Sequence, residues 1–386
     1  MNEWKTYKLG EICDLVAGFA FKSKDFGLYP NKVVKIADIQ PPIVSTTDLS
    51  GVNISSYDTS KLQKYVVKNG DYVLAMTGAT IGKLGRIVNN IEAYVNQRVL
   101  TFRPNISIVD KDFLYYQLSS ICFNKYILNH IDSETAQPNI SAGSIGQYEI
   151  QLPPLDKQKA IANILKSLDE KIKTNRRIND NLEQQAQALY KQWFVDNRDE
   201  DWEEYELNDV ATITAGGDKP QLCTNKKTSE CSIPIYSNGI EKEGLYGYTN
   251  VARIFENAIT ISARGTIGFV CLRTEPYVPI VRLISVVPMY ENLSVYFLYL
   301  WAVNQNISGT GTTQQQLTVP DFRKTKIIIP HQDLLMKFNS VITPIFNCIK
   351  QNKEENDKLV SLRDTLLPKL MSGELSVDDV STDLVC

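Results

Sequence analysis

The stretch "MTGATIGKLG", residues 76–85, decides how this chain is organised, because its centre occurs twice. Thr80-Ile81-Gly82 returns as Thr266-Ile267-Gly268 within "SARGTIGFV", residues 262–270. Self-similarity of this kind predicts two copies of one structural plan. Two further echoes support it: W-x-x-Y-x-L at residues 4–9 recurs at 202–207, and "AQPNIS" at 136–141 aligns with "TQQQLT" at 313–318.

The first copy of this stretch can be compared with a phosphate-binding loop, whose pattern is G-x-x-x-x-G-K-[ST]. Gly78 and Gly82 are one residue too close for that pattern, and Leu84 stands where a Mg²⁺-binding hydroxyl is required. In the second copy Phe269 replaces Lys83. Because a nucleotide loop would not survive the loss of its lysine, a nucleotide site is excluded.

The bulk composition predicts an ordinary globular protein with two or three domains. The 386 residues are 43% hydrophobic and 22% charged, with a formal net charge of −3. No run approaches ~18 apolar residues and no signal peptide begins the chain, so we expect no membrane span and a cytoplasmic location. The seven cysteines are scattered without a C-x-x-C pair, and only two histidines accompany them, so neither a metal site nor a disulfide framework is expected.

The echoes divide the chain into variable regions and constant helices. Strand-like runs rich in β-branched and aromatic residues alternate with turn residues in the variable regions, and a helix-like stretch precedes the end of each. The expected fold class is α+β: two mixed α/β domains in tandem, separated by two long helices that form an antiparallel coiled coil, with an internal pseudo-twofold repeat. The predicted segments are 1–150 and 199–330 for the variable domains, 151–198 and 331–375 for the helices, and 376–386 for a tail; the strand-like runs are 71–76, 94–102, 258–263 and 282–287, and the helix-like stretches are 111–127 and 292–304.

The two helical segments carry the strongest periodicity in the chain. Apolar residues alternate in steps of four and three through residues 161–193, and the same seam recurs through 338–370. In an antiparallel pair the asparagines near the middle of each seam would meet, where buried asparagine costs stability but fixes register; the alternative is that they face solvent. Pro344 should kink the second helix or mark a late start. The seam asparagines are Asn175 and Asn179 in the first helix and Asn352 and Asn356 in the second.

Two similar domains held apart by a rigid rod resemble a dimeric DNA reader made from one chain, with the rod length fixing the gap between two parts of a split target. The slightly negative charge requires that any DNA contact be a concentrated face. Basic, hydroxyl and amide side chains, with the turn glycines, are the groups that reach base edges and phosphates. The candidates are Lys22, Lys24, Thr77, Gly78, Thr80, Gly82, Lys83, Arg86, Asn96, Gln97, Arg98, Gln137 and Asn139 in the first copy, and Lys219, Arg264, Gly265, Thr266, Gly268, Arg273, Arg282, Thr313, Gln314, Gln315 and Gln316 in the second.

Each of these interpretations has an alternative. The T-I-G sequence could be a tight turn in which glycine supplies a positive φ, Arg98 could pair with a carboxylate, and residues 312–316 could be a polar surface loop. The whole chain could instead be a coiled-coil interaction scaffold without DNA binding, or a stand-alone nuclease or methyltransferase. An adenine methyltransferase needs an [ND]-P-P-[YF] loop for the flipped base, and the chain has only "QPPI" at 40–43 and "LPPL" at 152–155.

The helical segments carry a resemblance to a known family. "LPPLDKQKAIANILKSLDEKI" (152–172), "NLEQQAQALYKQWF" (181–194) and "LRDTLLPKLMSGEL" (362–375) resemble the DNA-specificity subunit of type I restriction-modification systems, and the repeat, the W-x-x-Y-x-L openings and the T-I-G turns fit the same family. The resemblance implies two target-recognition domains that each read one half of a bipartite site. Only Gly82 and Gly268 and the helices, as partner surface, carry over from the family's motifs.

The resemblance also implies partners. The two helices would dock modification (methyltransferase) subunits, which bind S-adenosylmethionine and methylate adenine at N6, and a separate restriction subunit would use ATP and Mg²⁺ to translocate and cut double-stranded DNA. This chain itself would be non-catalytic and would hold no cofactor or metal. The second copy departs from the first: "IIPHQD" (328–333) lacks the second proline of "LPPLD", and Leu335 replaces Gln158, which leaves open whether both helices bind partners equally.

Overall fold

The computed structural model describes residues 4–132, 138–289, 293–308, 316–377 and 379–380. The chain forms two compact units. The first unit is Met1–Lys173 with Asn356–Cys386, and the second is Thr174–Glu355. Each unit therefore contains one variable region together with half of each long helix, so the tertiary grouping cuts across the order of segments in the sequence.

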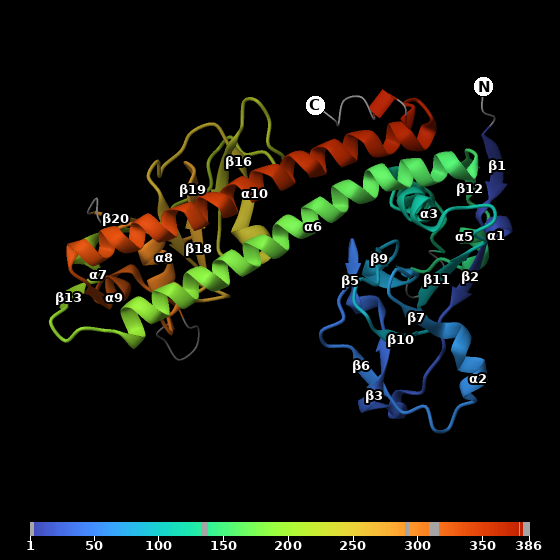
Figure 1. The fold of residues 1–386 in the computed structure, drawn as a ribbon, viewed down its shortest axis with the longest axis horizontal. Coiled ribbons are helices and arrows are strands. Elements are labelled where there is room, and N and C mark those ends of the chain that lie inside the picture. Colours follow the sequence, from blue (N-terminus) through green and yellow to red (C-terminus); the bar gives the residue numbers. More distant parts are fainter. Residues whose placement is uncertain (1–3, 133–137, 290–292, 309–315, 378, 381–386) are drawn as a thin grey trace. The chain divides into compact units, whose positions relative to one another are not determined.

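The two long helices are α6 (Leu155–Lys191) and α10 (Gln332–Ser372) (Figure 1). A short π-helix, Gln192–Asp196, continues α6. The prediction that Pro344 marks a late helix start is wrong, because α10 begins at Gln332 and runs through this proline.

Within each unit the two helices run antiparallel, as predicted. In the second unit Trp193, at the end of α6, packs its ring 5.7 Å from that of Phe338, near the start of α10. In the first unit an ion pair of 2.8 Å joins Asp169 of α6 to Arg363 of α10. In each unit, the halves of α6 and α10 turn the apolar seam predicted by the heptad pattern toward the core of that unit.

The first unit contains three sheets, with strand orders β1-β12, β6-β3-β10-β7 and β2-β11-β8-β9-β5-β4. Its strands are β1 (Lys5–Lys8), β2 (Cys13–Ala17), β3 (Phe26–Val34), β4 (Ile39–Gln40), β5 (Ile43–Val44), β6 (Ser50–Val52), β7 (Val66–Lys68), β8 (Tyr72–Ala75), β9 (Leu84–Arg86), β10 (Glu92–Val95), β11 (Val99–Pro104) and β12 (Glu149–Leu152). Its shorter helices are α1 (Leu9–Ile12), α2 (Thr59–Leu62), α3 (Lys111–Leu118), α4 (Ile121–Asn129) and α5 (Ala142–Gly146), with 3₁₀ turns at Ser23–Asp25, Ile36–Asp38, Gln63–Tyr65 and Gly78–Thr80. Figure 1 shows β3 and β6 at the end of this unit away from α6.

The second unit repeats the plan with strand orders β13-β21, β14-β20-β17-β18 and β16-β15-β19. Its strands are β13 (Glu203–Glu206), β14 (Ala211–Ala215), β15 (Ile233–Tyr236), β16 (Leu245–Thr249), β17 (Ala258–Ile261), β18 (Val270–Arg273), β19 (Val278–Pro279), β20 (Ile284–Pro288) and β21 (Lys326–Ile329). Its shorter helices are α7 (Leu207–Val210), α8 (Val295–Val303) and α9 (Val319–Arg323), with a 3₁₀ turn at Glu241–Gly244.

The sheets confirm the internal repeat. The order β14-β20-β17-β18 matches β2-β11-β8-β9, and the edge pair β13-β21 matches β1-β12. The helix-like stretches predicted before the end of each variable region are α3 with α4 and α8. The run 94–102, predicted as one strand, is two strands: β10 ends at Val95 and β11 begins at Val99. The break matters because residues 96–98 form a turn that carries candidate DNA contacts.

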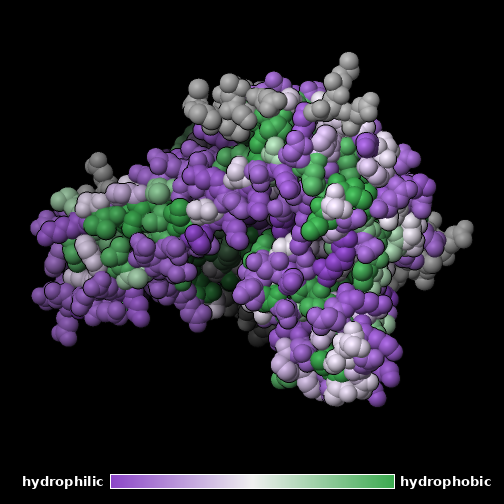
Figure 2. Space-filling model, turned by 45° about the vertical axis from the view of Figure 1, so that its right-hand side comes forward, coloured by the Kyte–Doolittle hydropathy of each residue, from purple (hydrophilic) through white to green (hydrophobic). Residues whose placement is uncertain are grey.

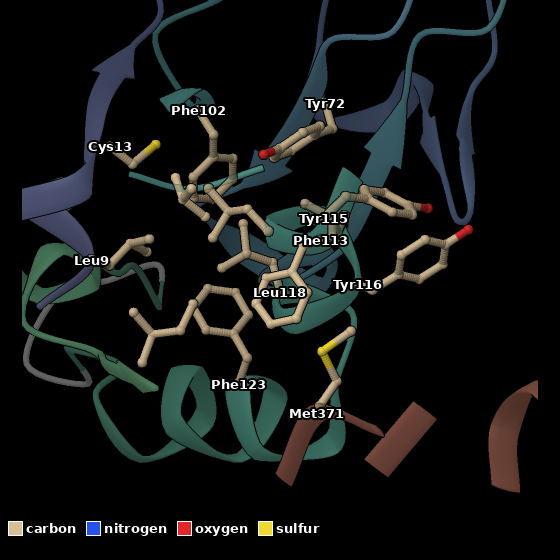
Figure 3. Close-up of a cluster of buried hydrophobic side chains, with 14 of the residues drawn as sticks. Leu9, Cys13, Tyr72, Phe102, Phe113, Tyr115, Tyr116, Leu118, Phe123 and Met371 are labelled. Atoms are coloured by element: carbon tan, nitrogen blue, oxygen red, sulfur yellow. The ribbon is translucent and has the colours of Figure 1, made fainter. Parts of the chain in front are cut away.

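The first unit's core lies between the β2–β11–β8 sheet and the helices. Tyr72 and Phe102 stack with ring centroids 5.6 Å apart, and Phe113 is fully buried beside them. Figure 3 shows Met371, from α10, projecting toward this cluster, and it is 7% exposed. Burying large side chains of this kind supplies most of the favourable free energy of a domain, so α10 is part of this unit's core.

The second unit has an equivalent aromatic core. Phe194 lies 5.0 Å from Phe297 and 4.7 Å from Phe338, measured between ring centroids, in edge-to-face geometry. Trp202, from the W-x-x-Y-x-L opening, packs against the same ring at 5.9 Å. Trp4 likewise belongs to the partly buried residues packed around the first core. The W-x-x-Y-x-L echo is thus explained by packing, because the tryptophan that opens each copy contacts the apolar core of its unit.

The departure of Leu335 from Gln158 has a packing explanation. Gln158 is 1% exposed, and its side-chain amide donates to the carbonyls of Ile108 and Pro153 at 3.1 and 2.9 Å. Its Oε1 accepts the backbone N–H of Asp110 at 2.8 Å. Leu335, 4% exposed, lies in the apolar core of the second unit instead. The substitution exchanges a buried polar clamp for an apolar contact, and it lies inside both units rather than on a partner-facing surface.

On the face shown in Figure 2, apolar side chains form separate patches among polar ones. Exposed large apolar side chains, such as Leu28, Ile121 and Phe255, are distributed over both units. Among the described residues, no helix is both long and apolar enough to span a bilayer.

Candidate nucleic-acid interface

The two T-I-G sequences are tight connections between antiparallel strands. In the first unit the turn joins β8 to β9, and the N–H of Gly82 donates to the carbonyl of Ala75 at 2.9 Å. In the second it joins β17 to β18, and the N–H of Gly268 donates to the carbonyl of Ser262 at 3.0 Å. Both glycines have positive φ, +81° and +82°. Because L-residues rarely adopt this conformation, the turn itself requires glycine.

Both turns also pack closely on neighbouring segments. A Cβ on Gly82 would lie 3.4 Å from Cγ2 of Ile127 in α4. A Cβ on Gly268 would lie 2.6 Å from the carbonyl oxygen of Ile307, closer than real contacts allow. Turn geometry and packing are therefore sufficient to explain the T-I-G repeat, while a contact of these turns with the DNA backbone stays a prediction.

In the first unit, the ends of three separate segments bring three candidates together. Arg98 accepts a hydrogen bond at its carbonyl from the N–H of Met76, at 3.0 Å. Asn139 forms a β-bridge with Thr77, and the next residue, Ile140, donates its N–H to the carbonyl of Met76 at 3.0 Å. Thr77, Arg98 and Asn139 constitute what we call the first polar cluster.

In the second unit a matching set forms at the same strand ends. Arg264 donates two hydrogen bonds, from Nε and Nη2, to Oε1 of Gln316 at 3.2 and 3.0 Å. Leu317 donates its N–H to the carbonyl of Ala263 at 3.1 Å, as Ile140 does to Met76. We call Arg264, Arg282 and Gln316 the second polar cluster.

The register of the strands shows that Arg98 and Arg282 are equivalent. Arg98 precedes Leu100 by two residues, and Leu100 lies opposite both Ala17 of β2 and Leu74 of β8. Arg282 precedes Ile284 by two residues, and Ile284 lies opposite the matching strands β14 and β17. Each arginine therefore lies in the turn that enters the second strand of its sheet, β11 in the first unit and β20 in the second.

The remaining positions correspond as well. Thr77 lies two residues after Ala75, and Arg264 two residues after Ser262, whose carbonyls close the two T-I-G turns. Asn139 and Gln316 directly precede Ile140 and Leu317, whose N–H groups bond to Met76 and Ala263. The arginines of the two clusters, Arg98, Arg264 and Arg282, lie at exposed positions. Beside the second cluster lies a cavity of about 400 Å³, whose lining includes Arg282, Gln316 and Thr318.

Arg86 and Arg273 are not available to DNA, which corrects their selection as candidates. Arg86 forms a 2.7 Å ion pair with Asp112, and its guanidinium lies 4.0 Å from the ring centroid of Tyr115. Burial raises the pKa of the Asp112 carboxyl, but Arg86 and Lys166 outweigh this effect and hold the pKa below its usual value.

Arg273 is more deeply enclosed, with a 3% exposed side chain. Its Nε donates to Oγ1 of Thr260 at 3.0 Å, its Nη2 donates to the carbonyl of Glu243 at 2.6 Å, and its guanidinium stacks 3.5 Å from the ring centroid of Tyr236. A buried guanidinium in these contacts supports the fold, so both arginines are structural.

The other candidates fall outside the two clusters. Lys22, Lys24, Lys83, Gln97 and Lys219 are exposed, and Asn96 is half-buried. Thr80 donates its hydroxyl to the carbonyl of Thr77 at 3.2 Å, whereas Thr266 has a buried hydroxyl without a partner in the described part of the chain. Gly78 and Gly265 have φ of +70° and +69° and open the two turns. Gln137, Thr313, Gln314 and Gln315 lie outside the described residues.

The seam asparagines are engaged in the helix interface. In the second unit Asn352 donates its side-chain amide to Oδ1 of Asn179 at 2.8 Å, and Asn179 donates to the carbonyl of Ile349 at 3.2 Å. Asn175 is 1% exposed and donates to Oε2 of Glu355 at 2.7 Å. Asn356, assigned to the first unit, is 8% exposed. The burial of Asn175 and the hydrogen bond from half-buried Asn352 to Asn179 contradict the alternative that Asn175 and Asn352 face solvent. The role of the asparagines in register stays a prediction.

Sequence reasoning did not single out Asn238, which lies beside the second polar cluster. Its side chain bonds the backbone of Ala263, next to Arg264, and of Val281, next to Arg282. The only local signal is the dipeptide Asn238-Gly239, which indicates a turn but says nothing of these contacts. Across the described ranges, no group of three or more histidine, cysteine, aspartate or glutamate side chains could hold a metal ion.

The sequence and the structure of this chain are similar to those of known proteins. A family model described as the type I restriction modification DNA specificity domain matches residues 1–184 and again 199–360. The type I restriction enzyme HindI specificity subunit of Haemophilus influenzae is 24% identical over 97% of this chain and 100% of that protein. A putative type I specificity subunit of Mycoplasma pneumoniae is 27% identical over 89% of each chain.

A solved structure shares the fold. The crystal structure of a type I restriction-modification S subunit from M. genitalium superposes with a TM-score of 0.60 at 18% identity, covering 95% of this chain and 96% of that one. The family match over most of the chain, in two copies that coincide with the structural repeat, decides between a DNA-specificity role and a scaffold without DNA binding. The chain belongs to the family of type I restriction-modification DNA specificity proteins.

Proposed function

We propose that this chain is the specificity subunit of a type I restriction-modification complex, and that each unit reads one half of a bipartite double-stranded DNA target through its polar cluster. The observation that carries the proposal is the equivalence of the two clusters. The same three positions hold Thr77, Arg98 and Asn139 in one unit and Arg264, Arg282 and Gln316 in the other, so two of the three differ in residue type. One scaffold with different side chains at its reading positions is what two different half-sites require.

The chemistry of the clusters suits base recognition. Arginine donates in a fork to O6 and N7 of guanine, and asparagine or glutamine pairs with N6 and N7 of adenine in the major groove. The second cluster has two arginines and an amide, and the Arg264–Gln316 hydrogen bonds fix the plane of one guanidinium. The first cluster offers one arginine and one amide, because the hydroxyl of its third member, Thr77, is buried and has no partner among the described residues.

We further propose that the chain is itself non-catalytic and works with partner subunits. The family to which the chain belongs supports this role. The exposed faces of α6 and α10 would dock modification subunits, and the buried asparagines would hold the register that sets the gap between half-sites. S-adenosylmethionine, ATP and Mg²⁺ would then be bound by the modification and restriction subunits. Stable DNA binding would depend on these partners, because the 41 basic side chains of the chain are outweighed by 44 acidic ones, and phosphate neutralisation is what binds a protein to DNA.

Modified-base sequencing of host DNA, with and without this gene, tests the proposal. We expect N6-methyladenine to disappear from one split motif when the gene is deleted. The variant Arg98→Ala should relax one half of the motif and Arg282→Ala the other, each by roughly 1–3 kcal/mol of discrimination, the usual contribution of a bidentate base contact. Lys125→Ala and Lys324→Ala, which remove an exposed charge from each unit, serve as matched controls and should leave both halves intact.

Three results would contradict the proposal. An unchanged methylome after deletion would refute the specificity role and favour an interaction scaffold. Relaxation of both halves by one arginine variant would refute the assignment of one half-site to each unit. Methylation by the purified chain alone would refute the non-catalytic assignment.

A further inference from the structure

The turn that carries Arg282 has an uncommon backbone. Val281 and Arg282 have φ of +54° and +60°, and the N–H of Leu283 donates to the carbonyl of Ile280 at 3.1 Å. Two consecutive positive φ values inside a closed four-residue turn define type I′, which favours Asn-Gly. A β-branched residue such as valine is a genuine outlier at positive φ. The surrounding structure must therefore hold this turn in place.

The equivalent turn of the first unit is not strained in this way. It is closed by the N–H of Val99, which donates to the carbonyl of Asn96 at 2.9 Å, and neither of its central residues, Gln97 and Arg98, has a positive φ. There the carbonyl of Arg98 accepts the N–H of Met76 directly. The arginine turn and the strand end that carries the T-I-G turn are thus joined backbone to backbone.

In the second unit a side chain makes this connection. Ala263, the counterpart of Met76, donates its N–H to Oδ1 of Asn238 at 2.7 Å. The Nδ2 of Asn238 donates to the carbonyl of Val281 at 2.7 Å. One amide therefore bridges the two backbone segments that the first unit bonds directly, and the amide orientation is set because one segment offers a donor and the other an acceptor.

Further backbone contacts hold the other side of the turn. The N–H groups of Val281 and Arg282 donate to the carbonyls of Gly217 and Gly216, each at 2.9 Å. The turn is consequently fixed on one side by Gly216 and Gly217, which follow β14, and on the other by Asn238. Arg264 follows Ala263 directly, so the same amide anchors the backbone beside both arginines of the second polar cluster.

We infer that Asn238 is a positioning residue that holds the left-handed Val281–Arg282 turn against the strand end bearing Arg264, so that both arginines meet the DNA as one preorganised pair. This inference rests on the proposed function. It makes base discrimination in the second half-site depend on Asn238, a residue outside the second polar cluster. A side chain fixed before binding loses less conformational entropy when it binds. Loosening the turn should therefore weaken discrimination in that half alone.

The test uses the full chain assembled with its methyltransferase partner and measures methylation rates on duplexes with single substitutions in either half of the motif. Asn238→Ala should lower discrimination in the second half about tenfold, the effect of losing one to two ordinary hydrogen bonds, and leave the first half unchanged. Val281→Gly in the same chain should restore discrimination to within about threefold, because glycine adopts positive φ without support. Asn208→Ala, an exposed residue of the same unit, is the matched control and should change neither half.

The outcomes separate this inference from the proposed function. If Arg282→Ala relaxes the second half but Asn238→Ala does not, Asn238 has no positioning role and the inference is overturned while the proposed function stands. If Arg282→Ala itself has no effect on either half, the proposed reading surface fails as well. If Asn238→Ala abolishes methylation altogether, recovery in the Asn238→Ala/Val281→Gly double variant supports the inference, and absence of recovery overturns it.

Discussion

The two T-I-G turns form a natural matched pair for a stability experiment. Gly82 and Gly268 have the same φ within a degree, +81° and +82°, so alanine at either position incurs the same left-handed strain, roughly 1–2 kcal/mol. They differ in the space around them. The new methyl group would lie 3.4 Å from a side-chain methyl of Ile127 in the first unit but 2.6 Å from the backbone oxygen of Ile307 in the second.

The magnitudes follow from that difference. A side-chain methyl can move by a few tenths of an ångström, so Gly82→Ala should destabilise its unit by about 1–2 kcal/mol from strain alone. A backbone oxygen cannot yield so cheaply, and overpacking adds about 1–3 kcal/mol. Gly268→Ala should therefore cost about 2–5 kcal/mol, summing both contributions.

The measurement must resolve the two units, because a chain of this size with two cores does not unfold in one step. Amide hydrogen exchange followed by mass spectrometry gives a local opening free energy for peptides covering β8 in the first unit and β17 in the second. Each variant should lower protection in its own unit. Equal costs for the two substitutions, or a larger cost for Gly82→Ala, would refute the reasoning from backbone strain and close approach.

Other consequences of the structure can be measured in the same chain. Burial raises the pKa of Asp71, but hydrogen bonds from Lys111 and Arg103 outweigh this and hold the pKa below its usual value. The ionised Asp71 therefore stabilises the fold above the unfolded pKa of about 3.9, and this stabilisation is lost as the pH falls through the folded pKa. Asp71→Asn should flatten the acid side of the curve of unfolding free energy against pH, measured by urea titrations. Asn352→Ala removes the donor to Asn179 and should lower the free energy of unfolding by about 1–3 kcal/mol. The double variant Asn179→Leu/Asn352→Leu should lower it by less than the two single leucine variants added together. Arg273→Ala should destabilise the second unit by about 1–3 kcal/mol, because it leaves the buried hydroxyl of Thr260 and the carbonyl of Glu243 without the guanidinium that donates to them, and intact protection of β17 and β18 would contradict its structural assignment.

The sequence by itself determined the repeat and the helical seams. These are periodic properties carried by residue spacing, and the antiparallel helices and matched sheets agree with them. The positive φ of the T-I-G glycines was one of two alternatives that the sequence left open, and the structure shows it. Local pattern also placed Arg98 and Arg282 among the candidates. It could not show that they are equivalent, because the loops before them differ in length and only strand register aligns them.

The tertiary structure alone decided which polar residues are available. Arg86 and Arg273 look like any other strand-end arginines in the sequence, yet Asp112 and Glu243 engage them from distant segments. Asn238 looks like a turn residue and is a bridge between two strands' ends. The burial and bonding of a charged or amide side chain depend on neighbours that folding brings in from far along the chain, and no local pattern records them.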